Sequence, residues 1–124
     1  WDMPVDDNAF LILETDKNQT AFLHVSCTEW KNTFSFEIYG KLGKLEISGL
    51  GGSYGIETLK HYNMLPEMGP PETTIYEFPM KDDSWEVELN DFILNIKNGN
   101  NSSSGIENAH HVLKIIDIAY GKKI

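Results

Sequence analysis

One short polar segment carries the side chains best suited to binding chemistry. Residues 28–33 read Thr-Glu-Trp-Lys-Asn-Thr and follow a predicted strand. An indole ring offers an apolar plate for a sugar ring or a partner protein, while neighbouring charged and amide groups can bind hydroxyls or a charged group. We therefore predict substrate contacts from Glu29, Trp30, Lys31 and Asn32. The alternative is an ordinary hairpin turn whose tryptophan packs on the sheet edge.

A second group of candidate ligands lies near the C-terminus. Glu107 and His110 are spaced i, i+3 on a predicted helix, as in some carboxylate–histidine metal sites. The adjacent His110 and His111, however, point about 100° apart around a helix, and no second Glu-x-x-His follows. We therefore predict no metal site and interpret these histidines as structural or solvated.

A glycine-rich segment at residues 49–55 reads Gly-Leu-Gly-Gly-Ser-Tyr-Gly. It resembles a phosphate-binding loop in composition only, because it lacks both the Lys-Ser/Thr of a P-loop and the G-x-G-x-x-G spacing of a dinucleotide fold. It also leads toward a strand-like segment and not toward a helix. We predict a turn here and no cofactor-binding residue.

The single cysteine, Cys27, cannot form an internal disulfide. Strand alternation sets it on the side of Leu23 and Val25, which predicts a small buried hydrophobe and not a nucleophile. A lone thiol also favours a reducing, cytoplasmic compartment. Since neither a Ser–His–Asp order nor a paired-carboxylate spacing stands out, we predict no catalytic residue in this chain.

Alternating and apolar runs predict six strands that must position these groups. They cover residues 9–14, 20–28, 34–39, 44–48, 56–62 and 73–78. Short strands joined by short turns favour antiparallel pairing. The glycines of residues 40–43 fit a tight turn between two of them.

After Pro79 the apolar period becomes helical, with predicted helices ending at Gly99 and Gly121. Asp83 is the expected cap of the first. Strands first and helices last indicate an α+β fold, an open-faced, largely antiparallel β-sheet of about six strands with two C-terminal helices packed on one face. The other face would carry Phe22, His24 and Tyr39, for which we predict a subunit interface.

Composition excludes several classes of protein. The 124 residues suit a single domain (1–124), and 40% hydrophobic content argues against disorder. A net charge of −9 argues against nucleic-acid binding, which needs clustered Lys and Arg. No apolar run approaches the roughly 20 residues of a membrane helix. The chain begins with tryptophan and carries no start signal, so we expect a piece of a longer protein.

Three segments together resemble one enzyme family. Residues 36–47, FEIYGKLGKLEI, resemble the glycine-turn hairpin of the Gfo/Idh/MocA oxidoreductases, the glucose–fructose oxidoreductase and inositol dehydrogenase family. Residues 85–99 and 105–120 resemble the two C-terminal helices of that family, in the same order and spacing. The resemblance covers nearly the whole chain from residue 8.

The resemblance implies a fold and a role. Family members join an N-terminal Rossmann domain, which binds NAD or NADP, to an α+β domain whose sheet supplies part of the substrate pocket. This chain would then be the C-terminal substrate-binding and oligomerisation domain of an NAD(P)-dependent oxidoreductase acting on a sugar, inositol or related polyol. The family also implies a homo-oligomer formed through the open sheet face.

The departures from the family pattern limit that role. The glycine-rich dinucleotide fingerprint, the Glu-Lys-Pro segment with the catalytic lysine and the Asp-x-x-x-His helix do not occur in this sequence. No family catalytic residue carries over, so we expect the chain alone to be inactive and to hold no cofactor. The alternative is a non-catalytic binding or assembly module with the same sheet. An unrelated small-ligand carrier would need a closed pocket within the domain.

Overall fold

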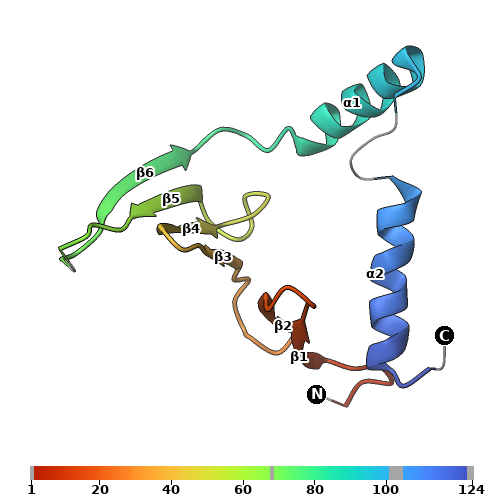
Figure 1. Cartoon of the computed structure of the whole chain (residues 1–124). Helices are drawn as coiled ribbons and strands as arrows, with labels where there is room; N and C mark the ends of the chain where they lie inside the picture. The colour runs from red at the N-terminus through yellow and green to blue at the C-terminus, as the bar shows by residue number, and fades with distance from the viewer. Residues whose placement is uncertain (1, 68, 101–104, 123–124) are drawn as a thin grey trace. The chain divides into compact units, whose positions relative to one another are not determined.

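The fold is α+β, with six antiparallel strands followed by two helices (Figure 1). The computed structural model describes residues 2–67, 69–100 and 105–122. The elements are β1 (Asn8–Glu14), β2 (Thr20–Ser26), β3 (Ser35–Tyr39), β4 (Gly43–Ser48), β5 (Glu57–Asn63), β6 (Glu72–Phe78), α1 (Ser84–Asn98) and α2 (Ile106–Ala119). The predicted fold class, strands and helices are confirmed, with element ends shifted by one or two residues.

The six strands form two sheets, which differs from the predicted single sheet. One sheet pairs β1 with β2, and the other has the order β3-β4-β5-β6. The chain divides accordingly into two compact units, Trp1–Thr28 with Glu86–Ile124, and Glu29–Trp85. An irregular loop joins β2 to β3. Unlike a tight turn, such a loop imposes no pairing register on the two strands that it connects.

In the smaller sheet, side chains separate onto two faces. Leu11 lies opposite Leu23, and both share a face with Leu13 and Val25. The other face pairs Ile12 with Phe22 and Phe10 with His24. Because both faces carry large apolar groups, this hairpin needs cover on each side.

In the four-stranded sheet, the two faces differ sharply in chemistry. One face, called here the apolar face, carries Phe36, Ile38, Leu45, Ile47, Leu59, His61, Tyr76 and Phe78, together with the polar Glu57, Asn63, Glu72 and Thr74 of β5 and β6. The opposite face, called here the polar face, carries Ser35, Glu37, Tyr39, Lys44, Glu46, Ser48, Thr58, Lys60, Tyr62, Thr73, Ile75 and Glu77. The period of two in a strand produces this separation from a simple alternation in sequence.

Glycines make the turns on either side of β4. Gly40 and Gly43 close the β3–β4 turn, where the Gly40 N–H donates to the Gly43 carbonyl at 2.8 Å. After β4, Gly49 is buried with a φ of 81°, and an added Cβ would lie 2.5 Å from the Ile56 carbonyl oxygen. Gly49 is therefore required both by its backbone conformation and by the close approach of a neighbouring strand.

The helices begin and end close to the predicted residues. The Ser84 N–H at the start of α1 donates to Asp82 Oδ1 at 3.0 Å, an Asx turn that leads into the helix, while capping by Asp83 stays a prediction. Gly99 and Gly121, with φ values of 65° and 71°, follow α1 and α2 as predicted C-terminal signals. No described residue of either helix is buried. The packing of the helices on one sheet face therefore stays a prediction.

The described residues include no buried hydrophobic side chain. On the apolar face, half of the Phe36, Tyr76 and Phe78 surface is exposed, at 52%, 50% and 52%. Exposed apolar side chains on one face are typical of a surface that associates with another, and such association stays a prediction here.

We predict that Gly49→Ala destabilises the fold far more than Gly52→Ala. Both glycines have positive φ, but a Cβ on Gly52 would meet no atom within 4 Å. Gly52→Ala should cost about 1 kcal/mol of unfolding free energy for the backbone conformation alone, and Gly49→Ala about 3 kcal/mol or more. Urea unfolding followed by circular dichroism measures both, and equal costs would contradict the proposed close contact with Ile56.

Candidate functional site

The predicted substrate loop is an exposed, irregular segment leading toward β3. Glu29, Trp30, Lys31 and Asn32 are all exposed, and Trp30 is 94% exposed. That exposure contradicts the alternative in which the indole packs on the sheet edge. The loop therefore presents its tryptophan to the surroundings, while the role of these four residues in substrate binding stays a prediction.

The backbone at Trp30 is unusual. Its φ is 54°, in the left-handed region that bulky residues rarely adopt, and the Lys31 N–H donates to the Glu29 carbonyl across it. Such a conformation costs of order 1–3 kcal/mol and is concentrated at functional sites. This outlier adds a backbone observation to the sequence-based hypothesis for the loop.

Two of the predicted interface residues, Phe22 and His24, share one face of β2. The His24 ring stacks on Phe10 at a centroid distance of 4.3 Å, and His24 Nε2 lies 2.9 Å from Asn8 Oδ1. Phe22 is 67% exposed. The face is thus aromatic and ordered by a cross-strand stack, and its role as an interface stays a prediction.

The third predicted interface residue, Tyr39, belongs to the other sheet. It lies at the end of β3 on the polar face and is 75% exposed. Its hydroxyl donates to Glu37 Oε2, and Lys44 Nζ lies 5.1 Å from its ring centroid. The hydrogen bond to Glu37 raises the pKa of Tyr39. The structure therefore assigns the three predicted residues to different sheets, and their common interface stays a prediction.

A cross-strand network on the polar face is the main feature that the sequence analysis missed. The Glu46 carboxylate accepts hydrogen bonds from Lys60 Nζ at 2.7 Å, Tyr62 Oη at 3.0 Å and Lys44 Nζ at 3.3 Å. Lys44 also forms an ion pair with Glu37. Nearby, the Ser48 and Thr58 hydroxyls lie 2.6 Å apart. The alternation of Glu and Lys in adjacent predicted strands was a signal of such a network. Which of these side chains pair, however, depends on the register between the strands.

The network strongly favours the charged forms of its carboxylates. Hydrogen bonds from Lys60, Tyr62 and Lys44 lower the pKa of Glu46 to about 2. Hydrogen bonds from Lys44 and Tyr39 lower the pKa of Glu37, and the pairing with Glu37 raises the pKa of Lys44. Because a general acid or base needs a pKa near the working pH, these carboxylates are suited to structure and not to proton transfer.

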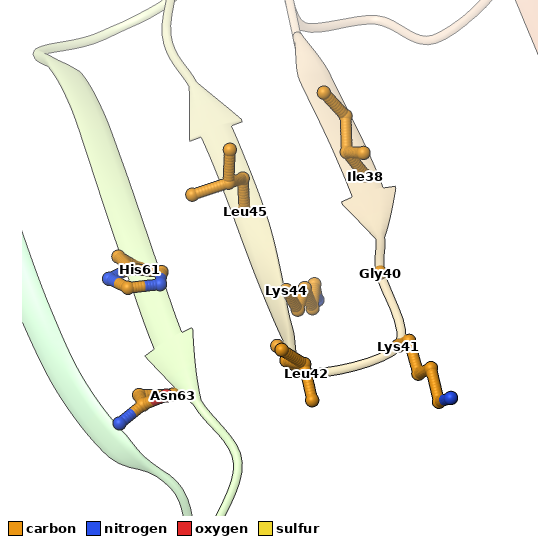
Figure 2. Close-up of a pocket in the computed structure, with 9 residues that line it drawn as sticks. Ile38, Gly40, Lys41, Leu42, Lys44, Leu45, His61 and Asn63 are labelled. Atoms are coloured by element: carbon orange, nitrogen blue, oxygen red, sulfur yellow. The ribbon is translucent and has the colours of Figure 1, made fainter.

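An open depression lies at the hairpin end of the apolar face (Figure 2). Ile38, Leu42 and Leu45 supply apolar walls, while His61 and Asn63 from β5 add polar groups on the same side. Small-molecule sites combine apolar walls with a few polar groups but enclose their ligand. This depression is open and is not a closed pocket of the kind a ligand carrier needs.

The glycine-rich segment does not fit a dinucleotide. It leads into strand β5, whereas a dinucleotide pyrophosphate binds at a helix N-terminus. The Gly51 N–H already donates to the Glu57 carboxylate at 2.7 Å, which takes the place that a phosphate oxygen would occupy. The segment is a turn, as predicted, and we derive no reaction step through a nicotinamide cofactor on these residues.

Cys27 is exposed, so its predicted burial is wrong. It lies just beyond the end of β2, where its Sγ donates to the Asp7 carbonyl at 3.3 Å and its N–H donates to the same oxygen at 2.9 Å. β2 ends at Ser26, and Leu23 and Val25, whose side Cys27 was predicted to share, are exposed as well.

Over residues 2–67, 69–100 and 105–122, no group of three or more His, Cys, Asp or Glu side chains is arranged to hold a metal ion. Glu107, His110 and His111 lie exposed on α2. Neither described helix combines the length and apolar character of a membrane-spanning segment. Comparisons with protein-family models, curated proteins and solved structures find no match to this chain.

We predict that Glu46 makes the free energy of unfolding depend on pH in the acidic range. Its pKa is lowered from the ordinary 4.5 to about 2, so its contribution is complete above the unfolded value and is lost as the pH falls from about 4.5 to 2. Glu46→Gln should remove most of this dependence.

Urea unfolding at pH 6 and at pH 3 measures the effect. Glu77→Gln is the matched control, since Glu77 lies on the same face in β6. An unchanged pH dependence in Glu46→Gln, or an equal change in Glu77→Gln, would show that the network does not control acid stability.

Proposed function

We propose that this chain is the C-terminal substrate-binding and oligomerisation domain of an NAD(P)-dependent oxidoreductase that acts on a sugar, inositol or related polyol. The support comes from the resemblance of three segments to the Gfo/Idh/MocA oxidoreductases. All three adopt the expected elements, namely the β3–β4 hairpin and the two helices. The glycine turn between β3 and β4 closes where the resemblance requires it, through the bond between Gly40 and Gly43.

The observation that carries the proposal is the four-stranded sheet with two unlike, open faces. The polar face is ordered by charge pairs around Glu46, and the apolar face leaves Phe36 and Tyr76 half exposed. A sheet with open faces serves association and does not enclose a reaction. The domain would therefore bind and position substrate, and would hold subunits together.

The exposed loop at residues 29–32 supplies groups for that binding. Trp30 offers an apolar plate, and the adjacent Lys31 and Asn32 offer donors to hydroxyl groups. Holding a polyol in one orientation raises the rate of a reaction whose chemical groups come from elsewhere. None of these residues needs a shifted pKa for this role.

A nicotinamide-linked activity screen of sugars and polyols with the full-length gene product tests the proposal. Reduction or oxidation of one polyol class, absent from the 124-residue chain alone, is the expected result. A full-length protein that binds no nicotinamide cofactor would favour the alternative, a non-catalytic binding or assembly module built on the same sheet.

We predict that Trp30→Ala and Lys31→Ala weaken substrate binding by the full-length enzyme. Each should raise KM by about three- to tenfold, as the loss of one stacking or polar contact does, with a smaller change in kcat. Lys17→Ala, in the exposed turn between β1 and β2, is the matched control for loss of a lysine. Unchanged KM in both loop variants would exclude the loop from the substrate site.

We also predict that Phe22→Asp weakens subunit association of the full-length protein. A buried, unpaired carboxylate in an aromatic interface is strongly unfavourable, so the dissociation constant should rise about tenfold or more. Thr20→Asp places the same charge on the same face at the strand end and should change association less. Sedimentation velocity measures both, and equal behaviour of the two variants would place the interface elsewhere.

A further inference from the structure

The four-stranded sheet ends in two edge strands of different character. β3 and β6 are the outer strands, and β6 lies beyond β5 at one margin of the sheet (Figure 1). Within the described part of the chain, no further strand pairs with either outer edge. An edge strand exposes unpaired N–H and C=O groups that can pair with another strand, and proteins commonly protect such edges.

β3 is short and carries a charge at its centre, whereas β6 is longer and carries its two charges, Glu72 and Glu77, toward its ends. β3 is five residues long and carries the charge of Glu37 at its centre. β6 is seven residues long, reads ETTIYEF and contains no lysine, proline or glycine. Its pairing with β5 is continuous from Glu57 opposite Phe78 to Asn63 opposite Glu72, so no bulge interrupts it. The outer edge of β6 is therefore the one available for pairing.

The sequence of β6 is compatible with antiparallel pairing to itself. If a two-fold axis passes midway between the two copies of Ile75, all seven residues are paired, and each face of one sheet continues into the same face of the other. Thr73 then lies opposite Glu77, Thr74 opposite Tyr76 and Glu72 opposite Phe78. No two like charges oppose each other in this pairing. The same two-fold pairing of β3 with itself would place Glu37 opposite Glu37, which is unfavourable.

The exposure of Ile75, at the centre of β6, is an independent observation that favours this pairing. It lies on the polar face, opposite Lys60, and is the only aliphatic side chain among the strand residues of that face. It is 55% exposed, on the strand at the margin of the sheet. Around the two-fold axis the two Ile75 side chains would be direct cross-strand neighbours, which turns an exposed apolar residue into a paired one.

We propose that two copies of this chain associate edge to edge through β6, with their two Ile75 residues opposed across the two-fold axis, so that their four-stranded sheets form one continuous sheet. This inference does not rest on the proposed oxidoreductase role. It also differs from association through a sheet face, because it uses backbone groups along one strand. The net charge of −9 opposes association of two copies, so salt should strengthen the dimer by screening.

Charge substitution at position 75 tests the proposal with the full chain in sedimentation velocity. Ile75→Lys and Ile75→Glu should each raise the dimer dissociation constant about tenfold or more, because two like charges then oppose each other. An equimolar mixture of the two variants should restore association. Ile75→Lys makes the net charge of −9 less negative by one, so a general charge effect would strengthen the dimer and not weaken it.

Disulfide trapping gives a second, independent readout. In a Cys27→Ser background, Ile75→Cys should form a disulfide-linked dimer on mild oxidation, because directly opposed antiparallel residues have Cα atoms about 4.5–5.5 Å apart. Ser35→Cys, on the same face of the other edge strand, is the matched control and should remain monomeric. Circular dichroism checks that each variant keeps the wild-type strand content.

The outcomes separate the possible arrangements. Restoration in the mixture together with trapping at position 75 supports the edge-to-edge dimer. A monomeric wild-type chain, a mixture that stays dissociated, or trapping at position 35 instead would overturn it. If Phe22→Asp abolishes association while trapping at position 75 persists, the chain has two separate interfaces. Failure of the proposed domain role can therefore be distinguished from failure of the edge-to-edge dimer.

Discussion

The hydrogen bonds between Glu46 and the side chains of β5 are the interaction on which the rest of the larger sheet depends. Lys60 and Tyr62 both reach Glu46 from the neighbouring strand, and Lys44 joins it to Glu37 on β3. A shift of one residue in register would move every side chain of a strand to the opposite face. The network therefore selects the register that keeps the polar and apolar faces separate.

That separation gives each face a different physical role. On the polar face, the charges of Glu37, Lys44, Glu46 and Lys60 pair with one another, so this face can remain in contact with water or meet another polar surface. The apolar face leaves Phe36, Tyr76 and Phe78 about half exposed and needs cover to be stable. The loop that carries Trp30, for which we predict substrate contacts, belongs to neither face.

Local features were predictable from the sequence because they depend on neighbouring residues. The β3–β4 turn follows from Gly40 and Gly43, and the helix ends follow from Gly99 and Gly121. The exposure of Trp30 agrees with its position in a polar segment. The burial predicted for Cys27 is wrong, and it needed more than a local pattern, since Leu23 and Val25 on the same predicted side are exposed as well.

The sequence by itself determined the six strands, the two helices, their order and the alternation that assigns residues such as Leu45 and Glu46 to opposite faces. Only the tertiary structure decided that the strands divide into two sheets, that Lys60 bonds to Glu46 and that β6 is an outer edge. The physical reason is that alternation reflects contacts within one strand, whereas sheet membership and charge pairing arise between segments far apart along the chain, whose register no short-range pattern encodes.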